Sequence, residues 1–533
     1  MLRLALLTLL FCASAFADDH LDTFLNTDVF ELEIAADPQI SPDGSQVVYV
    51  RNANDIMSDS TRANIWIVDA DGSNHRPLLS GADSYSSPRW APDGSRLAYV
   101  SSAEGRGPEL YVRWMDTGQT ALLSNLENSP RGLSWSPDGK SIAFSALVKG
   151  EGMTLATPLA KPKGANWAPG VTVTDQLNYR SDGRGYLDVG YTHVFVLPAD
   201  GGTPRQVTSG DYNHSGSLSW SPDGEEIVVS ANRNEDWQYR QQNSDLWSVN
   251  LTSGEMSQLT SRDGPDFAPA FSPDGSRIAY LGYDDERMGY HNTQVNILDV
   301  NSGEVSVLTD DLDRSVVSVN WSGSSSQLLI SYDDFGKRNL ASLDMEGNVS
   351  PLLSDMGSVG ISRPYTSGSY SVADNGAYAY SAGDAQRPAD VAIGRGGSST
   401  KLTDLNADLL DHKTLGEVRE VSWRSSVGDH DVNGWLVTPP DFDADEDYPL
   451  LLEIHGGPFT AYGPYFSTEV QLYAAAGYVV LYTNPRGSTS YGYEFANEIH
   501  HNYPSQDYDD LISGVDAVID MGFIDEDQLF VTG

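Results

Sequence analysis

Cysteine and basic residues are scarce in this sequence of 533 residues. Cys12 is the only cysteine, and it lies in a stretch that we expect to be removed, so the mature protein has no disulfide, cysteine nucleophile or cysteine-ligated metal. Lys and Arg number 32 against 75 Asp and Glu, which gives a formal net charge of −43. Nucleic-acid binding needs a basic surface that releases counterions, so the composition excludes a nucleic-acid partner. We expect the excess acid to form a solvated surface.

No apolar run is long enough to span a membrane. The N-terminal run covers residues 4–11, whereas a spanning helix needs roughly 18 or more. It follows Arg3 and precedes an A-x-A cleavage pattern that ends at Ala17. We therefore expect a signal peptide over residues 1–17, cleaved near Ala17, and export to the periplasm or the cell exterior. A lipoprotein anchor at Cys12 is the alternative, but the residue before it is not small.

A four-residue turn motif repeats through the first 400 residues. Pro fixes φ, Asp bonds its own backbone, and Gly takes the positive φ that such a turn needs. The copies are Ser41-Pro42-Asp43-Gly44, Ala91-Pro92-Asp93-Gly94, Ser136-Pro137-Asp138-Gly139, Ser221-Pro222-Asp223-Gly224 and Ser272-Pro273-Asp274-Gly275, with degenerate copies at Trp321-Ser322-Gly323-Ser324 and Asp374-Asn375-Gly376. Each lies between short β-rich runs.

The spacing of these copies is mostly 45 to 51 residues, which is typical of one four-stranded propeller blade. Seven copies predict an all-β, seven-bladed β-propeller over residues 36–405, preceded by an N-terminal segment over residues 18–35. The alternative, an unrelated series of hairpins in a sandwich, does not explain the regular spacing. One interval is longer and predicts an insertion over about residues 149–186.

The pattern changes after Leu405. Short strands and helices alternate, which predicts a parallel, doubly wound α/β sheet. The expected elements are strands near 421–423, 434–437, 450–454, 478–482 and 529–532, with helices near 468–476 and from about 505. We assign residues 406–533 to the N-terminal part of an α/β domain.

A glycine-rich turn, Ile454-His455-Gly456-Gly457-Pro458, leaves the carboxyl end of the buried strand near 450–454. In α/β-hydrolases such a turn offers backbone N–H groups to a developing oxyanion, and only glycine allows that close approach. His-Gly-Gly also occurs in plain strand-to-loop turns. Taken alone, it would also fit an esterase.

Further motifs accompany this turn in a fixed order. They are Gly434-Trp435, Tyr448-Pro449, Asn484-Pro485-Arg486-Gly487-Ser488-Thr489-Ser490-Tyr491-Gly492, Asp507-Tyr508-Asp509-Asp510 and Gly514-Val515-Asp516. Together with the propeller, this order resembles the prolyl oligopeptidase family of serine peptidases, in particular its acylaminoacyl-peptidase and dipeptidyl-peptidase branch. The resemblance implies a propeller joined to an α/β-hydrolase domain. It also implies hydrolysis of peptide bonds in short peptides through an acyl-enzyme. The sequence has no metal-ligand cluster, P-loop or dinucleotide fingerprint, so we expect no cofactor and no metal. Peptide substrates are the partners it predicts, and it sets no oligomeric state.

The nucleophile motif of that family is missing. A strand such as residues 529–532 would lead into the nucleophile elbow, and the catalytic Asp and His would follow it. The 533 residues contain no G-x-S-x-G, so none of the catalytic triad is present. We expect an incomplete hydrolase domain that stops just before the elbow and is inactive by itself. The alternative is an exported propeller that serves as a binding module, with a vestigial hydrolase domain.

The resemblance assigns roles to several of the residues that are present. Gly456 and Gly457 become candidates for half of the oxyanion hole, and His455 and Arg486 become candidates that line the site. In the propeller insertion, Arg180 and Tyr186 are candidates for substrate binding. The alternative for Arg180 is a turn in which it pairs with Asp182, and for Arg486 a role in holding loops together.

Overall fold

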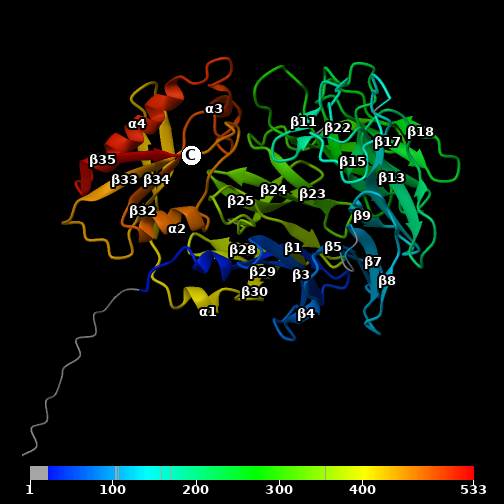
Figure 1. The fold of residues 1–533 in the computed structure, drawn as a ribbon, viewed down its shortest axis with the longest axis horizontal. Coiled ribbons are helices and arrows are strands. Elements are labelled where there is room, and N and C mark those ends of the chain that lie inside the picture. Colours follow the sequence, from blue (N-terminus) through cyan, green and yellow to red (C-terminus); the bar gives the residue numbers. More distant parts are fainter. Residues whose placement is uncertain (1–21, 103–104, 106, 158, 169, 355) are drawn as a thin grey trace, which may run out of the picture.

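The computed structural model describes residues 22–102, 105, 107–157, 159–168, 170–354 and 356–533. The expected signal peptide, residues 1–17, lies outside these residues. The described chain forms seven antiparallel four-stranded sheets arranged as a ring, followed by a five-stranded sheet with helices on one side of the ring (Figure 1). The predicted fold class, a seven-bladed β-propeller followed by an α/β-hydrolase region, is thus confirmed.

The blades follow one another along the chain. The first three are β1 (Glu33–Ile40), β2 (Gln46–Asp55), β3 (Ser60–Asp69) and β4 (Arg76–Leu79); β5 (Tyr85–Trp90), β6 (Arg96–Ser101), β7 (Glu109–Trp114) and β8 (Thr120–Leu122); and β9 (Arg131–Trp135), β10 (Ser141–Lys149), β13 (Gly190–Pro198) and β14 (Arg205–Gln206). The fourth and fifth are β15 (His214–Trp220), β16 (Glu226–Ala231), β17 (Asp245–Asn250) and β18 (Met256–Gln258); and β19 (Asp266–Phe271), β20 (Arg277–Gly282), β21 (Gln294–Asp299) and β22 (Val305–Val307). The last two are β23 (Val316–Trp321), β24 (Gln327–Asp334), β25 (Lys337–Asp344) and β26 (Val349–Leu353); and β27 (Tyr370–Val372), β28 (Tyr378–Asp384), β29 (Arg387–Arg395) and β30 (Ser398–Lys401).

The repeated turn motif joins the first and second strands of each blade, and the first copy shows why its residues are needed. Gly44 has φ +76°, which a residue with a side chain rarely adopts. The N–H of Ser45 donates to the Asp43 carboxylate at 3.0 Å, and the N–H of Gln46 donates to the Ser41 hydroxyl at 3.0 Å. The side chains therefore bind the backbone groups that the turn leaves unpaired.

Tryptophan links neighbouring blades. In four blades the first strand ends with a Trp. The indole N–H of this Trp donates to a backbone carbonyl in the first strand of the preceding blade. These pairs are Trp90 with Gln39, Trp135 with Arg89, Trp220 with Ser134 and Trp321 with Ala270, at 2.9–3.2 Å. Each ring is large and apolar, so it fills the wedge between two sheets while its one polar atom stays paired.

The ring closes by side-by-side packing of the first and last blades, because each blade is built from consecutive strands. Strand β1 packs against β27, β28 and β29. The N–H of Ile40 donates to the Ser371 hydroxyl at 2.8 Å. The Asn406 side chain both accepts from the Glu33 N–H and donates to its carbonyl, each at 2.8 Å. No strand from one blade completes the other within the described residues.

The C-terminal sheet is mixed, so the predicted all-parallel sheet is partly wrong. Its order is β31-β32-β34-β33-β35, built from β31 (Glu417–Arg424), β32 (Asp431–Thr438), β33 (Tyr448–Glu453), β34 (Val479–Asn484) and β35 (Ile524–Thr532). The pairs β33–β34 and β33–β35 are parallel, whereas β31–β32 and β32–β34 are antiparallel. Parallel neighbours need a long crossover connection, and the loop of residues 425–430 between β31 and β32 is too short for one.

Two helices cover opposite faces of this sheet. The short helical segments are η1 (Asp28–Phe30), α1 (Ala407–Leu410) and α3 (Tyr493–Asn497), and the longer helices are α2 (Thr468–Ala475) and α4 (Gln506–Ile519). Helix α2 packs on a cluster that includes Leu451 and Val480, and α4 packs on a cluster that includes Leu450 and Val479. Successive strand residues point to opposite faces, so the two helices enclose the sheet.

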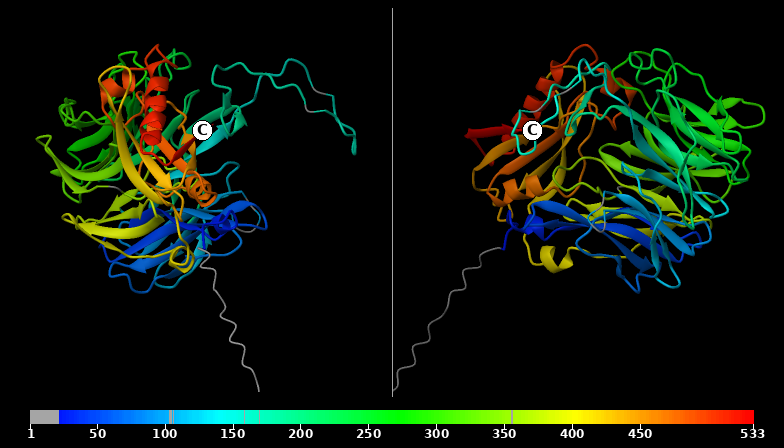
Figure 2. Two further views of the ribbon diagram at one scale, coloured as in Figure 1. Left: turned by 90° about the vertical axis from the view of Figure 1, so that its left-hand side faces the viewer. Right: turned by 45° about the vertical axis from the view of Figure 1, so that its right-hand side comes forward.

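The α/β region packs on the end of the propeller where second strands turn into third strands. The N–H groups of Phe335 and Gly336, between β24 and β25, donate to Ser490 at 3.0 and 2.7 Å. Tyr290, between β20 and β21, donates its N–H to Asn497 at 3.0 Å. The corresponding connection of the third blade, residues 150–189, contains the hairpin β11 (Arg180–Ser181) and β12 (Gly185–Tyr186) and projects from the body (Figure 2).

Candidate active site

The glycine-rich turn lies where the carboxyl ends of two parallel strands meet. It follows β33, and the N–H of Ile454 donates to Thr532 at the end of β35 at 3.0 Å. Gly457 has φ +137°, and a Cβ there would lie 3.1 Å from both Phe459 and Thr460. At Gly456 a Cβ would meet nothing within 4 Å. The turn therefore requires glycine at position 457, while position 456 faces open space.

The backbone donors of this turn differ. The N–H of Gly456 donates to the Tyr365 hydroxyl at 3.3 Å. The N–H of Gly457 has no hydrogen-bond partner among the described residues. Gly457 thus presents a free donor at the carboxyl edge of the sheet, the place where ligands of α/β proteins bind.

Tyr365 is a propeller residue that the sequence analysis missed. It lies in the connection between the sixth and seventh blades, and its ring packs on Tyr462 with centroids 4.8 Å apart. Tyr462 in turn donates to the buried Glu453 at 2.9 Å, whose pKa is raised by burial. No local pattern marks Tyr365, because its contact with the turn joins residues 91 positions apart.

His455 is buried and held at both ring nitrogens. Nε2 lies 2.9 Å from the Ser488 hydroxyl, and Nδ1 lies 3.0 Å from the Gly456 carbonyl. Burial lowers its pKa, which favours the neutral ring. The side chain therefore ties the turn to the loop after β34 rather than offering a free base.

Arg486 holds three segments together. It binds Asp510 of α4 through two contacts, Nη2–Oδ1 at 2.6 Å and Nε–Oδ2 at 2.9 Å. Nη1 donates to Gln506 at 2.8 Å, and Nη2 donates to the Val427 carbonyl at 2.8 Å. Hydrogen bonding to Asp510 raises the pKa of the guanidinium. Each of its guanidinium nitrogens has a partner within the protein, so its geometry is that of a residue that organises loops.

Comparison with known proteins matches both parts of the chain. Residues 44–245 and 190–364 match the TolB beta propeller domain, and residues 464–533 match the prolyl oligopeptidase family. The "Uncharacterized peptidase YuxL" of Bacillus subtilis is 30% identical over 527 residues, which cover 95% of this chain and 77% of that protein. The chain belongs to the prolyl oligopeptidase family.

Other known proteins match over a similar share of the chain. Dipeptidyl-peptidase 5 of Porphyromonas gingivalis is 26% identical over 517 residues, covering 93% of this chain and 72% of that protein. Pyrococcus horikoshii acylaminoacyl peptidase superposes with a TM-score of 0.77 at 21% identity, covering 95% of this chain and 74% of that one. The latter likeness supports the shared propeller and hydrolase fold. Since the chain belongs to the prolyl oligopeptidase family and its sequence relatives are named as peptidases, it belongs to a family of hydrolases.

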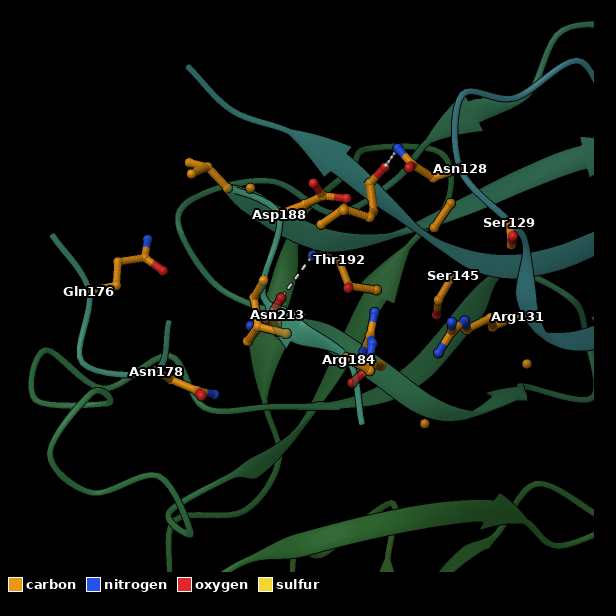
Figure 3. A pocket seen from close by; sticks show the side chains of 18 of the residues that line it. Asn128, Ser129, Arg131, Ser145, Gln176, Asn178, Arg184, Asp188, Thr192 and Asn213 are labelled. Carbon is orange, nitrogen blue, oxygen red and sulfur yellow. Dashed lines mark hydrogen bonds between the residues drawn. The ribbon is translucent and has the colours of Figure 1, made fainter. Parts of the chain in front are cut away.

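Arg180 and Tyr186 belong to the insertion of the third blade, whereas the glycine turn belongs to the α/β region. They pair with each other across the hairpin β11–β12, and both side chains are exposed. Tyr186 also packs on Tyr179, with ring centroids 6.1 Å apart. The alternative pair of Arg180 with Asp182 does not form in the described hairpin. Tyr179 and Tyr186 line a cavity of about 1100 Å³, whereas Arg180 does not. Figure 3 shows other residues of the same cavity wall.

The peptidase shows no grouping of three or more His, Cys, Asp or Glu side chains that could hold a metal ion, in the part of the chain that the structure describes. Over the same residues, no helix combines the length and apolar character of a membrane span.

Proposed function

We propose that this chain supplies the propeller and the first part of the catalytic domain of a serine peptidase. It would act on short peptides, releasing dipeptides or acylated amino acids or cutting within an oligopeptide, through an acyl-enzyme. A serine would attack the peptide carbonyl, a histidine would take its proton, and an aspartate would orient the histidine. The propeller would restrict access to peptides that are short or unfolded.

The free N–H of Gly457 is the observation that carries this proposal. An oxyanion hole needs preorganised donors that lack a partner in the resting protein. Gly457 offers such a donor beside the carboxyl end of β35, which is where the family places its nucleophile elbow. The Gly456-Gly457 turn would thus supply one of the two oxyanion donors, and the residue after the serine would supply the other.

The 533 residues are expected to be inactive by themselves, because an oxyanion donor cannot replace a nucleophile and its base. They contain no G-x-S-x-G. Incubation with a fluorophosphonate probe should label no serine, and aminoacyl and dipeptidyl chromogenic substrates should not be cleaved. Labelling of a serine within the 533 residues would contradict this assignment.

The two glycines provide a matched pair for testing the oxyanion role in a longer form that carries the serine, aspartate and histidine. Gly457→Ala, at φ +137°, should displace the free N–H and lower kcat about 10²- to 10³-fold. Gly456→Ala, which meets open space, should change kcat little. Equal kcat in both variants would show that Gly457 is not part of the oxyanion hole. A longer form without activity would favour the alternative, an exported propeller that binds peptides and carries a vestigial hydrolase domain.

A further inference from the structure

The cavity of about 1100 Å³ opens at the end of the propeller on which the hydrolase region packs. Its wall includes Arg131 at the start of β9 and Ser145 on β10, which pair with each other. It also includes Ser215 near the start of β15 and residues of the 150–189 segment. First strands start, and second strands end, at the same end of each blade. That is the end from which β24–β25 and β20–β21 reach the hydrolase region.

The charge of the cavity wall is opposite to that of the chain. The whole sequence has 75 acidic and 32 basic residues, whereas the wall has three arginines and two aspartates. Arg89 is already engaged, since its Nη1 lies 2.8 Å from Asp37. Asp188 lies 3.9 Å from Lys149. Asp175 is the remaining acidic residue of the wall. The pKa of Tyr191 is raised by burial first, then by Asp211, with a smaller contribution from Asp175.

Arg131 and Arg184 are the two cationic side chains left over. Neither forms an ion pair or a side-chain hydrogen bond with another described residue. Figure 3 shows the Arg131 side chain reaching from β9 into the cavity, where the side chain of Arg184 also ends. They belong to different elements, β9 and the inserted hairpin, so the two walls of the cavity each bring one guanidinium.

Two unpaired guanidinium groups in one cavity repel each other, and an anion between them removes that repulsion. Arginine presents a planar set of donors that matches a carboxylate in a bidentate way. The wall also has neutral groups, including Thr192, Asn213 and Trp237. These side chains suit a peptide backbone, because they provide hydrogen-bonding groups and one flat apolar surface without further charge.

We infer that this cavity binds a peptide by its C-terminal carboxylate, held between Arg131 and Arg184. The choice of a peptide as ligand rests on the proposed function, and the choice of a carboxylate rests on the two arginines. A peptide held here is bound at the propeller end that faces the hydrolase region. The site therefore selects peptides whose free C-terminus can reach the two arginines.

Isothermal titration of the 533-residue chain with the tetrapeptide Ala-Ala-Phe-Ala and with its C-terminal amide tests this inference. Binding needs no nucleophile, so the result does not depend on turnover. The free acid should bind at least about tenfold more tightly than the amide, because the amide lacks the charge that the arginines bind. An amidated peptide with an internal Glu distinguishes the C-terminal carboxylate from a side-chain carboxylate. If that peptide bound more tightly than the free acid, the arginines would bind acidic side chains, and the C-terminal assignment would be overturned.

Arg131→Gln and Arg184→Gln should each remove most of the preference for the free acid. Arg205→Gln is the matched control, since Arg205 is an exposed arginine on the outer strand of the same blade and does not line the cavity. Both cavity arginines are exposed, so the variants should keep the thermal midpoint of the parent chain. Equal binding of acid and amide, or no effect of either variant, would overturn the inference while leaving the peptidase proposal intact. Arginine-dependent binding of succinate without binding of any peptide would instead contradict the peptide ligand, and with it the proposed function.

Discussion

The propeller and the α/β region are stabilised in different ways. In the propeller the same turn and the same inter-blade contact recur, and the seven sheets of the described chain close into a ring. In the α/β region each contact occurs once. Among the 533 residues its sheet has β31 at one edge and β35 at the other, and Leu529, Phe530 and Val531 of β35 are 45%, 47% and 67% exposed.

This difference predicts where single substitutions do most harm. Loss of one repeated contact in the ring leaves the equivalent contacts of other blades in place, as in other repeat architectures. When a unique buried contact in the α/β region is lost, no equivalent contact remains. Substitutions in the two regions therefore test whether the regions are stabilised in different ways.

Arg486→Ala should have the largest effect. It leaves the buried Asp510 carboxylate without its guanidinium, and breaking a buried pair in this way costs about 3–5 kcal/mol. Urea denaturation with hydrogen exchange should show the loss confined to the α/β region. Arg424→Ala is the control, because Arg424 forms an exposed pair with Asp431 at 2.9 Å and should cost less than about 1 kcal/mol. Equal losses for the two variants would show that Arg486 does not organise the region.

Gly336→Ala should come next, and it tests the junction between the two regions. Gly336 has φ +74°, and a Cβ would lie 2.5 Å from the Tyr462 carbonyl and 2.6 Å from the Trp435 ring. We expect a loss of about 2–3 kcal/mol, since the steric clash adds to the conformational cost. Gly254→Ala has φ +75° but meets nothing within 4 Å, so it should lose only about 1 kcal/mol. Similar thermal midpoints for the two variants would mean that the junction moves enough to accommodate the added methyl group.

Asp245→Asn should have a smaller effect of opposite sign. Burial, together with the charge of Asp266, raises the pKa of Asp245 to about 6. The unfolded carboxyl has a pKa of about 3.9, so the folded state binds more protons between about pH 4 and 6. The free energy of unfolding therefore falls as pH rises through that window. Above pH 6 the folded state carries the full cost of the buried, charged Asp245.

The Asn variant should be about 1–2 kcal/mol more stable than the parent at pH 8 and should show a flatter profile between pH 4 and 6. Its side-chain oxygen can still accept from Gln258, which lies 3.0 Å from Asp245 in the parent. Denaturation at pH 4.5 and pH 8 measures both values. If the stability of the variant changed between pH 4.5 and pH 8 by as much as that of the parent, Asp245 would not be the source of the pH dependence.

The same contrast explains how much the sequence predicts. A turn such as Ser41 to Gly44 is local, so its repeats reveal the number of blades directly. The glycine turn was found for the same reason, because its residues are consecutive. Tyr365 was missed, since only the packing of the connection between the sixth and seventh blades on the α/β region brings it to Gly456. The antiparallel pairing of β32 with β34 was missed too, because strand order in an open sheet depends on long-range packing.

Val531→Lys should have the smallest effect on stability and a clear effect on association. In the 533-residue chain β35 is an edge strand with exposed apolar side chains, and such edges pair with other chains unless a charge interrupts them. A lysine at this exposed position should change the free energy of unfolding by less than about 0.5 kcal/mol. It should reduce concentration-dependent self-association in sedimentation velocity. Val171→Lys makes the same change in charge at a side chain that is 92% exposed in the propeller insertion, away from any sheet edge. Reduced association in the Val171 variant but not in the Val531 variant would show that the insertion, and not the open sheet, is the contact between copies.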